Sequence, residues 1–384
     1  MPARLPYLRL SGFYFFYFSA LGALLPYWPL YLQAQGFTPA EIGQLMAILA
    51  GSRVVAPNLW GWWADRSGRT LRLIRWATFL TLGGFCGVFY AQGFLEVAWV
   101  MLAFTFFWNA TLPLFETVTL GHLHHDAKRY SRVRLWGSFG FIATVTALGK
   151  GLEGLIAIAC LPQIILVLFV ALWLNTLWVP SSGRERHGDG HGSLGAILKR
   201  REVLAFFLAS LLLQIGHGPY YVFYSVYLKE HGFTSGETGQ LWALGVMAEI
   251  VLFAVLHRVF GRYSLGAVFR LSLALTALRW LLIAWGVEHL ALLVAAQLLH
   301  AVSYGAAHAA SVHLVHGYFR GPHHGKGQAL YSSIGFGLGG ALGSLLSGYL
   351  WTAWGPHGLY TAAAGITLLA LWVASGGGRR AGLV

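Results

Sequence analysis

Charged residues are scarce in this chain. Of its 384 residues, 10% are charged and 57% are hydrophobic, whereas soluble domains carry about 25% charged residues. A water-soluble protein of this size needs a polar shell that such a composition does not supply. The shortage of charge excludes an ordinary soluble globular protein and favours a chain whose apolar surface faces lipid.

Cysteine is also rare, with only Cys86 and Cys160, both inside apolar stretches. Two such cysteines give no disulfide framework and no metal-ligand spacing. The histidines of the loops lack metal-site spacing as well, and the sequence contains no nucleophile elbow or phosphate-binding loop. We therefore expect no enzymatic activity, no metal and no cofactor.

Acidic residues are half as numerous as basic ones, 13 against 26, which gives a net charge of +13. A basic chain can bind nucleic acid, but the distribution of charge indicates another cause. The two ends and alternate loops hold 22 of the 26 Lys and Arg residues; these loops begin near Arg66, Lys128, Arg184, Arg258 and Arg320. This asymmetry follows the positive-inside rule. We expect no nucleic-acid partner, an even number of membrane crossings and both termini in the cytoplasm.

Long apolar runs, in contrast, are abundant. A helix needs about 20 mainly apolar residues to cross a bilayer, and twelve runs approach or exceed that length. They cover residues 8–33, 41–60, 72–91, 95–119, 133–150, 154–178, 201–228, 238–257, 265–286, 289–316, 327–350 and 356–375. The longest connection, residues 179–200, is rich in Gly, Ser, His and charge, and we interpret it as a cytoplasmic linker.

The sequence contains an internal repeat. Residues 35–48 read QGFTPAEIGQLMAI and residues 231–244 read HGFTSGETGQLWAL, with 8 of 14 positions identical. Self-similarity at a fixed offset signals duplicated structure, and six predicted helices separate the two copies. We predict an all-α integral membrane fold of 12 transmembrane helices in two pseudo-symmetric six-helix bundles, residues 1–178 and 201–384. Parallel repeats of this kind occur in transporters that rock around a central site.

Between the second and third predicted helices stands the sequence GWWADRSGR. It resembles the signature loop of the major facilitator superfamily, and the matching residues are Gly61, Asp65, Arg66, Gly68 and Arg69. We expect these residues to form a cytoplasmic gate in which Asp65 sits against the positive N-terminus of a helix beginning near Gly327. The position equivalent to Asp65 in the second half is Gly261, so this gate should be asymmetric.

Four further segments resemble the phenylpropionate permease family: MAEIVLF around Glu249, ALRWLL around Arg279, QLLHAVSYGAAHAA at 297–310 and VRLWGSFGF at 133–141. The resemblance extends over nearly the whole chain. It implies a proton-linked transporter of the bacterial inner membrane. This branch of the superfamily neighbours the lac permease and nucleoside symporter branches.

Charged residues lie within or at the ends of predicted helices at Arg53, Glu116, Arg134, Glu249 and Arg279. A charge near the bilayer centre costs several kcal/mol and needs a partner. Similar depth on sequential helices predicts that Glu249 pairs with Arg279 and Glu116 with Arg134, while Arg53 shares Glu116 or faces a ligand. Such pairs can be purely structural. Alternatively, a carboxylate that gains and loses a proton as access alternates couples protons to transport, with Glu249 the first candidate and Glu116 the second.

The predicted tenth helix carries five polar residues at spacings that place them on one face: Gln297, His300, Tyr304, His308 and Ser311. Because this helix lines the central cavity in the superfamily, we expect the face to line it here too; the alternative is a set of packing residues. Histidine titrates near physiological pH. We therefore assign His300 to proton coupling together with Glu249, Arg279, Glu116 and Arg134.

The candidate substrate-binding residues combine aromatic rings with a few hydrogen-bonding groups, which suits a small ligand with an apolar or cyclic body. They are Tyr17, Arg53, Asn109, His217, Tyr221, Gln297, Tyr304 and His308. We predict a monomeric, proton-coupled transporter of a small organic solute in the lipid bilayer. An aromatic carboxylate neutralised by Arg53 or Arg279 is the first candidate, a sugar or nucleoside the second. A non-transporting scaffold or receptor is the alternative from another class.

Overall fold

The computed structural model describes residues 6–124, 126–181 and 194–376, and in these ranges the chain forms helices joined by loops. The centre of the predicted linker, residues 182–193, lies outside the described residues. So do the two ends of the chain, which we predict to be cytoplasmic.

Long helices follow one another closely in the first half. They are α1 (Tyr7–Ala34), α2 (Pro39–Ser67), α3 (Thr70–Cys86), α4 (Phe94–His122), α5 (Ala127–Gly151) and α6 (Leu161–Trp178). Short 3₁₀ turns, η1 (Gly87–Phe89) and η2 (Ile158–Cys160), adjoin α3 and α6. Each long helix overlaps one predicted span.

The second half is less regular. It contains α7 (Leu194–Leu198), α8 (Arg201–Glu230), α9 (Ser235–Phe260), α10 (Leu265–Gly286), α11 (Leu290–Leu298), α12 (Ala307–Tyr318), α13 (His324–Tyr331) and α14 (Gly340–Ala374), with a 3₁₀ turn η4 (Gly321–His323). Two π-helical segments, η3 (Ala301–Ala306) and η5 (Ser332–Gly339), connect α11 to α12 and α13 to α14. The predicted helix 289–316 is therefore interrupted by π geometry at its centre.

The predicted loop between residues 350 and 356 is a sharp kink inside α14. Gly355 adopts φ 66° and ψ −177°, and Pro356 follows it. Only a residue without a Cβ tolerates this backbone conformation readily, and proline cannot continue the preceding helix. In the described part of the chain, eight helical segments are long and apolar enough to cross a membrane.

The repeated sequence has a structural explanation. Gly36 and Gly232 both have positive φ, 88° and 82°, at the turns that follow α1 and α8. Thr38 and Thr234 then cap the N-termini of α2 and α9, each in a capping box with the glutamate three residues later. Because both copies need a turn glycine and a helix cap, these residues are the ones the two halves share.

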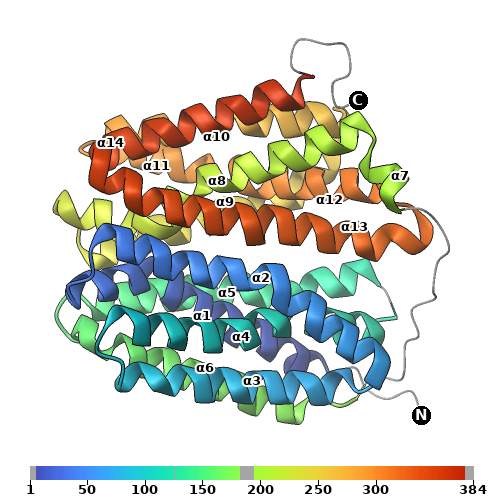
Figure 1. Ribbon diagram of the computed structural model, residues 1–384, viewed down its shortest axis with the longest axis horizontal. Coiled ribbons are helices and arrows are strands. Elements are labelled where there is room, and N and C mark those ends of the chain that lie inside the picture. The colour runs from blue at the N-terminus through green and yellow to red at the C-terminus, as the bar shows by residue number, and fades with distance from the viewer. Residues whose placement is uncertain (1–5, 125, 182–193, 377–384) are drawn as a thin grey trace.

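The two halves lie side by side as two layers of helices (Figure 1). The α1–α6 helices, blue to green, form one layer, and the helices from α8 to α14, yellow-green to red, form the other. The layers pack through α2 against α14 and η5, α5 against α9, and α1 against α8. Residues contributed by these helices can therefore meet between the halves.

Contact between the layers is tight where α1 ends and α2 and α9 begin. The Tyr27 hydroxyl donates to the Val145 carbonyl at 2.7 Å and lies 3.4 Å from the Ser235 carbonyl. The Gly236 N–H donates to the Glu153 carboxylate at 3.1 Å. These bonds join α1 and the end of α5 to the first turn of α9.

Candidate functional site

Arg279 on α10 is completely buried, with 0% of its surface exposed. Its Nε donates to the Ala296 carbonyl at 2.9 Å, Nη1 to Ser303 Oγ at 3.1 Å, and Nη2 to Gln297 Oε1 at 3.5 Å. Its guanidinium carbon lies 4.2 Å from the centre of the Tyr220 ring. Neutral acceptors and a π face therefore surround this cation.

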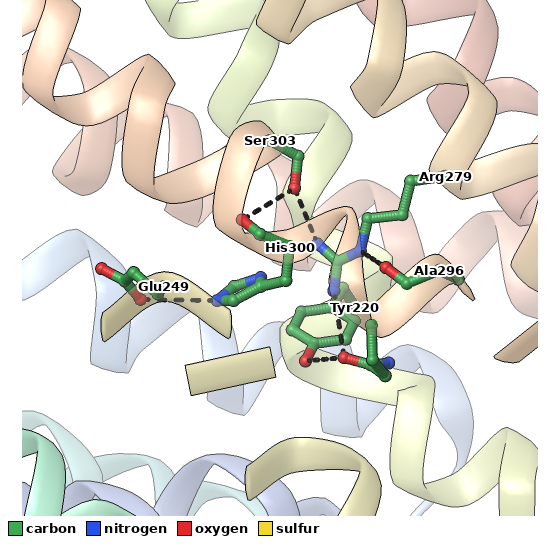
Figure 2. Close-up of polar contacts among 7 residues, drawn as sticks. Tyr220, Glu249, Arg279, Ala296, His300 and Ser303 are labelled. Carbon is green, nitrogen blue, oxygen red and sulfur yellow. Dashed lines mark hydrogen bonds and ion pairs between the residues drawn. The ribbon is translucent and has the colours of Figure 1, made fainter. Parts of the chain in front are cut away.

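Glu249 on α9 faces a histidine instead of an arginine. Its Oε2 lies 3.8 Å from Nε2 of His300, and the side chains are 17% and 7% exposed. The predicted pair of Glu249 with Arg279 is therefore wrong. Depth along the helices was similar, but depth does not give the direction in which a side chain points, and Arg279 points to the opposite side of the α11–η3 segment (Figure 2).

The polar face of the predicted tenth helix continues as a stack of rings. The His300 and Tyr304 rings are 5.4 Å apart and 4° from parallel, and Tyr304 and His308 are 6.0 Å apart and 13° from parallel. His308 then stacks on Tyr331 of α13, and its Nδ1 lies 3.2 Å from the Tyr331 hydroxyl. Tyr331 was absent from the sequence-based candidates because nothing in its spacing links it to this face.

The residues at the two ends of that face, Gln297 and Ser311, make hydrogen bonds and do not belong to the ring stack. Gln297 Oε1 accepts a hydrogen bond from the Tyr220 hydroxyl at 3.1 Å. Ser311 Oγ donates to the Ala307 carbonyl of its own helix at 2.7 Å. The continuous part of the face is therefore the ring stack from His300 to His308.

The candidates on α8 face the same stack. His217 is buried; its ring lies 6.0 Å from the Tyr221 ring and 6.5 Å from the Tyr304 ring. His217 Nδ1 is 2.8 Å from the Leu213 carbonyl, which makes Nδ1 the protonated nitrogen of the neutral ring. Nε2 is buried without a hydrogen-bond partner in the structure.

The first half contributes a polar group in which Asn109 and Ser52 are buried and Arg53 is partly buried. Arg53 on α2 donates from Nε to Asn109 Oδ1 at 3.2 Å, and the Asn109 amide donates to Ser52 Oγ at 2.7 Å and to the Leu49 carbonyl at 2.9 Å. Asn109 is thus fixed with its oxygen toward the guanidinium. The Arg53 backbone packs on η5 of the second half, because a Cβ on Gly337 would lie 3.3 Å from the Arg53 carbonyl carbon, so Arg53 lies where the two halves meet.

Glu116 and Arg134 are neighbours, as predicted. Arg134 Nε lies 3.9 Å from Glu116 Oε1, which also accepts from the Tyr130 hydroxyl at 3.3 Å. The guanidinium of Arg134 lies 4.1 Å from the Phe18 ring centre. The two side chains are 32% and 36% exposed, so the pair borders an accessible space.

The residues of the signature loop line a cavity of about 600 Å³. Gly61, Asp65, Gly68 and Arg69 contribute to its wall, and Gly325 and Ala329 of α13 contribute from the second half. Arg66 stacks over the Trp62 ring, 4.0 Å from its centre. Asp65 and the helix expected to receive it thus share one cavity, while the direct contact between them remains a prediction.

Buried charges, stacked histidines and a cavity between two layers of apolar helices together define a membrane transporter. The chain belongs to the MFS_1 like family, whose model matches residues 7–362. It is a multi-pass transporter of the major facilitator superfamily, and the resemblance noted in the sequence is confirmed.

Named relatives cover most of the chain. It is 29% identical over 375 residues to the "Probable 3-phenylpropionic acid transporter" of Escherichia coli (strain K12), covering 94% of this chain and 95% of the relative. It is 28% identical to the maltose permease of Geobacillus stearothermophilus, covering 91% and 88%. The crystal structure of the nucleoside transporter NupG superposes with a TM-score of 0.82 at 18% identity, covering 95% of this chain and 97% of that one. At 18% identity, this likeness supports the fold of the chain and says nothing of its substrate.

Proposed function

We propose that this protein is a proton-coupled symporter of a small organic acid, with an aromatic carboxylate as the first substrate candidate. The proposal includes twelve transmembrane helices in two six-helix domains, residues 1–178 and 201–384, joined by the linker 179–200. It also includes a monomer in a bacterial inner membrane with both termini in the cytoplasm. In that orientation the Tyr27 and Glu153 contacts lie at the outer end and the signature loop at the inner end.

The observation that carries the choice of an acid is the different state of two arginines, the buried Arg279 and the partly buried Arg53. Arg279 uses all three of its nitrogens on neutral acceptors. Arg53 uses Nε on Asn109, and its two Nη groups make no hydrogen bond to the described residues. A guanidinium with two free donors in one plane is suited to bidentate carboxylate binding. We therefore assign the carboxylate to Arg53 and no longer to Arg279.

Aromatic rings of both halves fit the remainder of such a substrate. Tyr17 stacks on Trp108 at 5.0 Å in the first half, and Tyr304 belongs to the ring stack of the second half. A flat apolar body held by aromatic faces, together with one charged contact, is the composition expected of a small-ligand site. The 3-phenylpropionic acid transporter of E. coli, named for an acid of this form, is the relative that agrees with this interpretation.

Proton coupling is assigned to Glu249 and His300. Their carboxylate and imidazole attract each other strongly only when the histidine is protonated and the carboxylate is not. A pair whose charge depends on bound protons, located where access alternates, can exchange protons with either side. The Glu116 and Arg134 pair is the second candidate.

A neutral sugar or nucleoside is the second candidate substrate. The stacked rings of His300, Tyr304 and His308 suit the face of a sugar or a base as well as that of a benzene ring. Relatives named for maltose and nucleosides cover 91% and 73% of the chain. Such a substrate would leave Arg53 without an anionic partner.

Uptake into proteoliposomes tests the proposal. Radiolabelled 3-phenylpropionate, maltose and uridine are offered with and without an inward proton gradient. We expect the acid to accumulate above its external concentration only with the gradient, and acid addition to alkalinise the external medium. Accumulation of maltose or uridine in place of the acid would overturn the substrate assignment. Acid uptake that ignores the gradient would overturn the coupling.

A further inference from the structure

The helix that contains His300 changes geometry at the site. It is α-helical up to Leu298, π-helical from Ala301 to Ala306 and α-helical again from Ala307. π-helical turns are uncommon, are found frequently at functional sites, and are less favourable than the α-helix. Contacts outside this helix must therefore hold the segment in its π form.

Arg279 supplies such contacts from both sides of the junction. Its Nε bonds to Ala296 in the last turn of α11, and its Nη1 bonds to Ser303 within η3. Ser303 Oγ in turn donates to the His300 carbonyl at 3.3 Å. One guanidinium thus ties together the residues before and after His300, as Figure 2 shows.

This arrangement fixes the direction of the imidazole. With Ala296 and Ser303 held on the Arg279 side, the His300 ring projects to the opposite side, where Glu249 lies 3.8 Å away (Figure 2). Gly305 of the same segment is pressed against Glu249, because a Cβ there would lie 3.0 Å from Glu249 Cγ. The segment therefore meets α9 closely at the proton site.

We propose that Arg279 is a positioning residue that holds the π-helical segment η3 so that His300 faces Glu249, and that it is not an ionic partner of the carboxylate. The inference rests on the proposed proton coupling at Glu249 and His300. It names the residue that sets the geometry of that site and removes Arg279 from the groups that exchange protons or bind the substrate.

The chemistry of the side chain supports this role. The guanidinium is planar and presents donors in fixed directions, so it can bond to three different residues at once. The rings of Tyr220 and Trp280, with centres 4.2 Å and 4.8 Å away, stabilise the charge without a carboxylate. A lysine would keep the charge but could not reproduce the three directed bonds.

Titratable and charged groups approach His300 from every neighbouring element. They are Glu249 on α9, Arg279 on α10, His217 and Tyr220 on α8, and Tyr304 on η3 itself. A changed dependence of uptake on pH would not by itself show whether Arg279 positions His300 or acts on it through its charge. The test therefore needs a measurement of the segment itself.

Amide hydrogen exchange of the purified full-length protein provides that measurement, combined with uptake in proteoliposomes. Ser303→Ala removes one contact of Arg279 without changing any charge. We expect exchange in residues 299–306 to rise about tenfold, as loss of one hydrogen bond to a charged group predicts. We expect gradient-driven uptake to fall while exchange of substrate across the membrane continues. Ser272→Ala on α10 should change neither; among the described residues, its buried hydroxyl bonds only to the Val268 carbonyl.

Arg279→Lys gives the decisive comparison. If Arg279 positions the segment, Arg279→Lys should behave as Ser303→Ala does. Amide exchange in η3 should then be faster, and uptake should depend less on pH than in the wild type. Wild-type amide exchange and a wild-type pH profile in Arg279→Lys would overturn the proposal, because a point charge would then suffice. Uptake by the unmodified protein that ignores the proton gradient would overturn the proposed coupling, whereas the amide exchange of η3 would still decide the role of Arg279.

Discussion

Glu249 and His300 face each other across the contact between α9 and η3, with Oε2 3.8 Å from Nε2. Both side chains are largely buried, so their charges are poorly screened by water. A glutamate paired with arginine would carry a permanent ion pair. A histidine partner, in contrast, is charged only while it holds a proton. In the proposed coupling, this difference lets the site bind and release a proton as access alternates.

Replacement of Glu249 by glutamine should separate coupling from transport. The variant keeps the size and a hydrogen-bonding group of the side chain but cannot ionise. We expect Glu249→Gln to lose accumulation driven by a proton gradient, while counterflow of labelled against unlabelled substrate continues at a rate within about threefold of wild type.

The control is Glu288→Gln, which alters an exposed carboxylate beyond the end of α10. It should behave as wild type in both assays. Gradient-driven accumulation that survives in Glu249→Gln would show that protons are carried elsewhere, and Glu116 would be the next residue to replace.

Arg53 should determine whether the substrate must be an anion. Arg53→Gln removes the charge near Asn109 and the two free donors. We expect the apparent affinity for 3-phenylpropionate to fall at least about tenfold, since one charge-assisted contact contributes about 1.5–3 kcal/mol. We expect competition by the neutral amide 3-phenylpropionamide to be weak in the wild type and unchanged in the variant.

The amide serves as the matched probe because it keeps the ring and the chain length of the acid. Equal losses for acid and amide would indicate that Arg53 supports the site structurally. An unchanged affinity for the acid would remove Arg53 from the substrate site altogether.

The sequence was sufficient to predict the all-helical fold, the long helices of the first half and the repeated turn and helix cap. Runs of apolar residues are set by the thickness of the bilayer, so their lengths can be read directly. The shared residues from Gly36 to Glu41 and from Gly232 to Glu237 encode a turn and a helix cap, which are local structures. Helix α10 coincides with its predicted span, residues 265–286.

The partners within the site could not be predicted in the same way. The rotation of a helix about its axis decides which residues meet, and a π-helical segment changes that rotation along one helix. This is why Arg279 was paired with Glu249 from depth alone and why the stacking of Tyr331 on His308 was missed. The predicted pair of Glu116 and Arg134 in the first half is confirmed, because these residues lie at adjoining helix ends.

In the proposed orientation, the carboxylate of Glu153 lies at the outer end, and we expect its contact with α9 to hold that end closed. It accepts from the Gly236 N–H in the first turn of α9, where the helix dipole favours negative charge. Glu153→Gln should weaken this contact by about 1 kcal/mol, which corresponds to an approximately fivefold shift toward the outward-open state. The measurement is the rate at which an impermeant thiol reagent labels Tyr221→Cys in a variant lacking Cys86 and Cys160.

Glu96→Gln is the control for this prediction. Glu96 also accepts a backbone N–H near the start of a helix, from Gln92, but both residues belong to the first half. Its replacement should leave the labelling rate unchanged. If Glu153→Gln labels no faster than this control, the contact does not contribute to closure of the outer end.

Close packing of α2 on α14 should be needed for the same closure. A Cβ on Gly43 would lie 2.8 Å from backbone atoms of Gly348 and Ser344, whereas a Cβ on Gly51 would lie 3.6 Å from the Ala341 side chain. Both glycines lie in α2 and face α14, so Gly43→Ala and Gly51→Ala gain the same helix propensity, about 1 kcal/mol. They differ only in whether the two helices must move apart.

We therefore expect Gly43→Ala to raise the rate at which the impermeant reagent labels Tyr221→Cys at least about fivefold. Backbone atoms, unlike the end of a flexible side chain, cannot move away from the added methyl group unless the whole helix moves. Gly51→Ala should raise thermal stability slightly and leave accessibility unchanged. Equal accessibility in the two variants would show that α2 and α14 stay in place when the outer end opens. In that case the separation of the halves would have to occur where α5 packs on α9, near Glu153 and Gly236, or where α1 packs on α8.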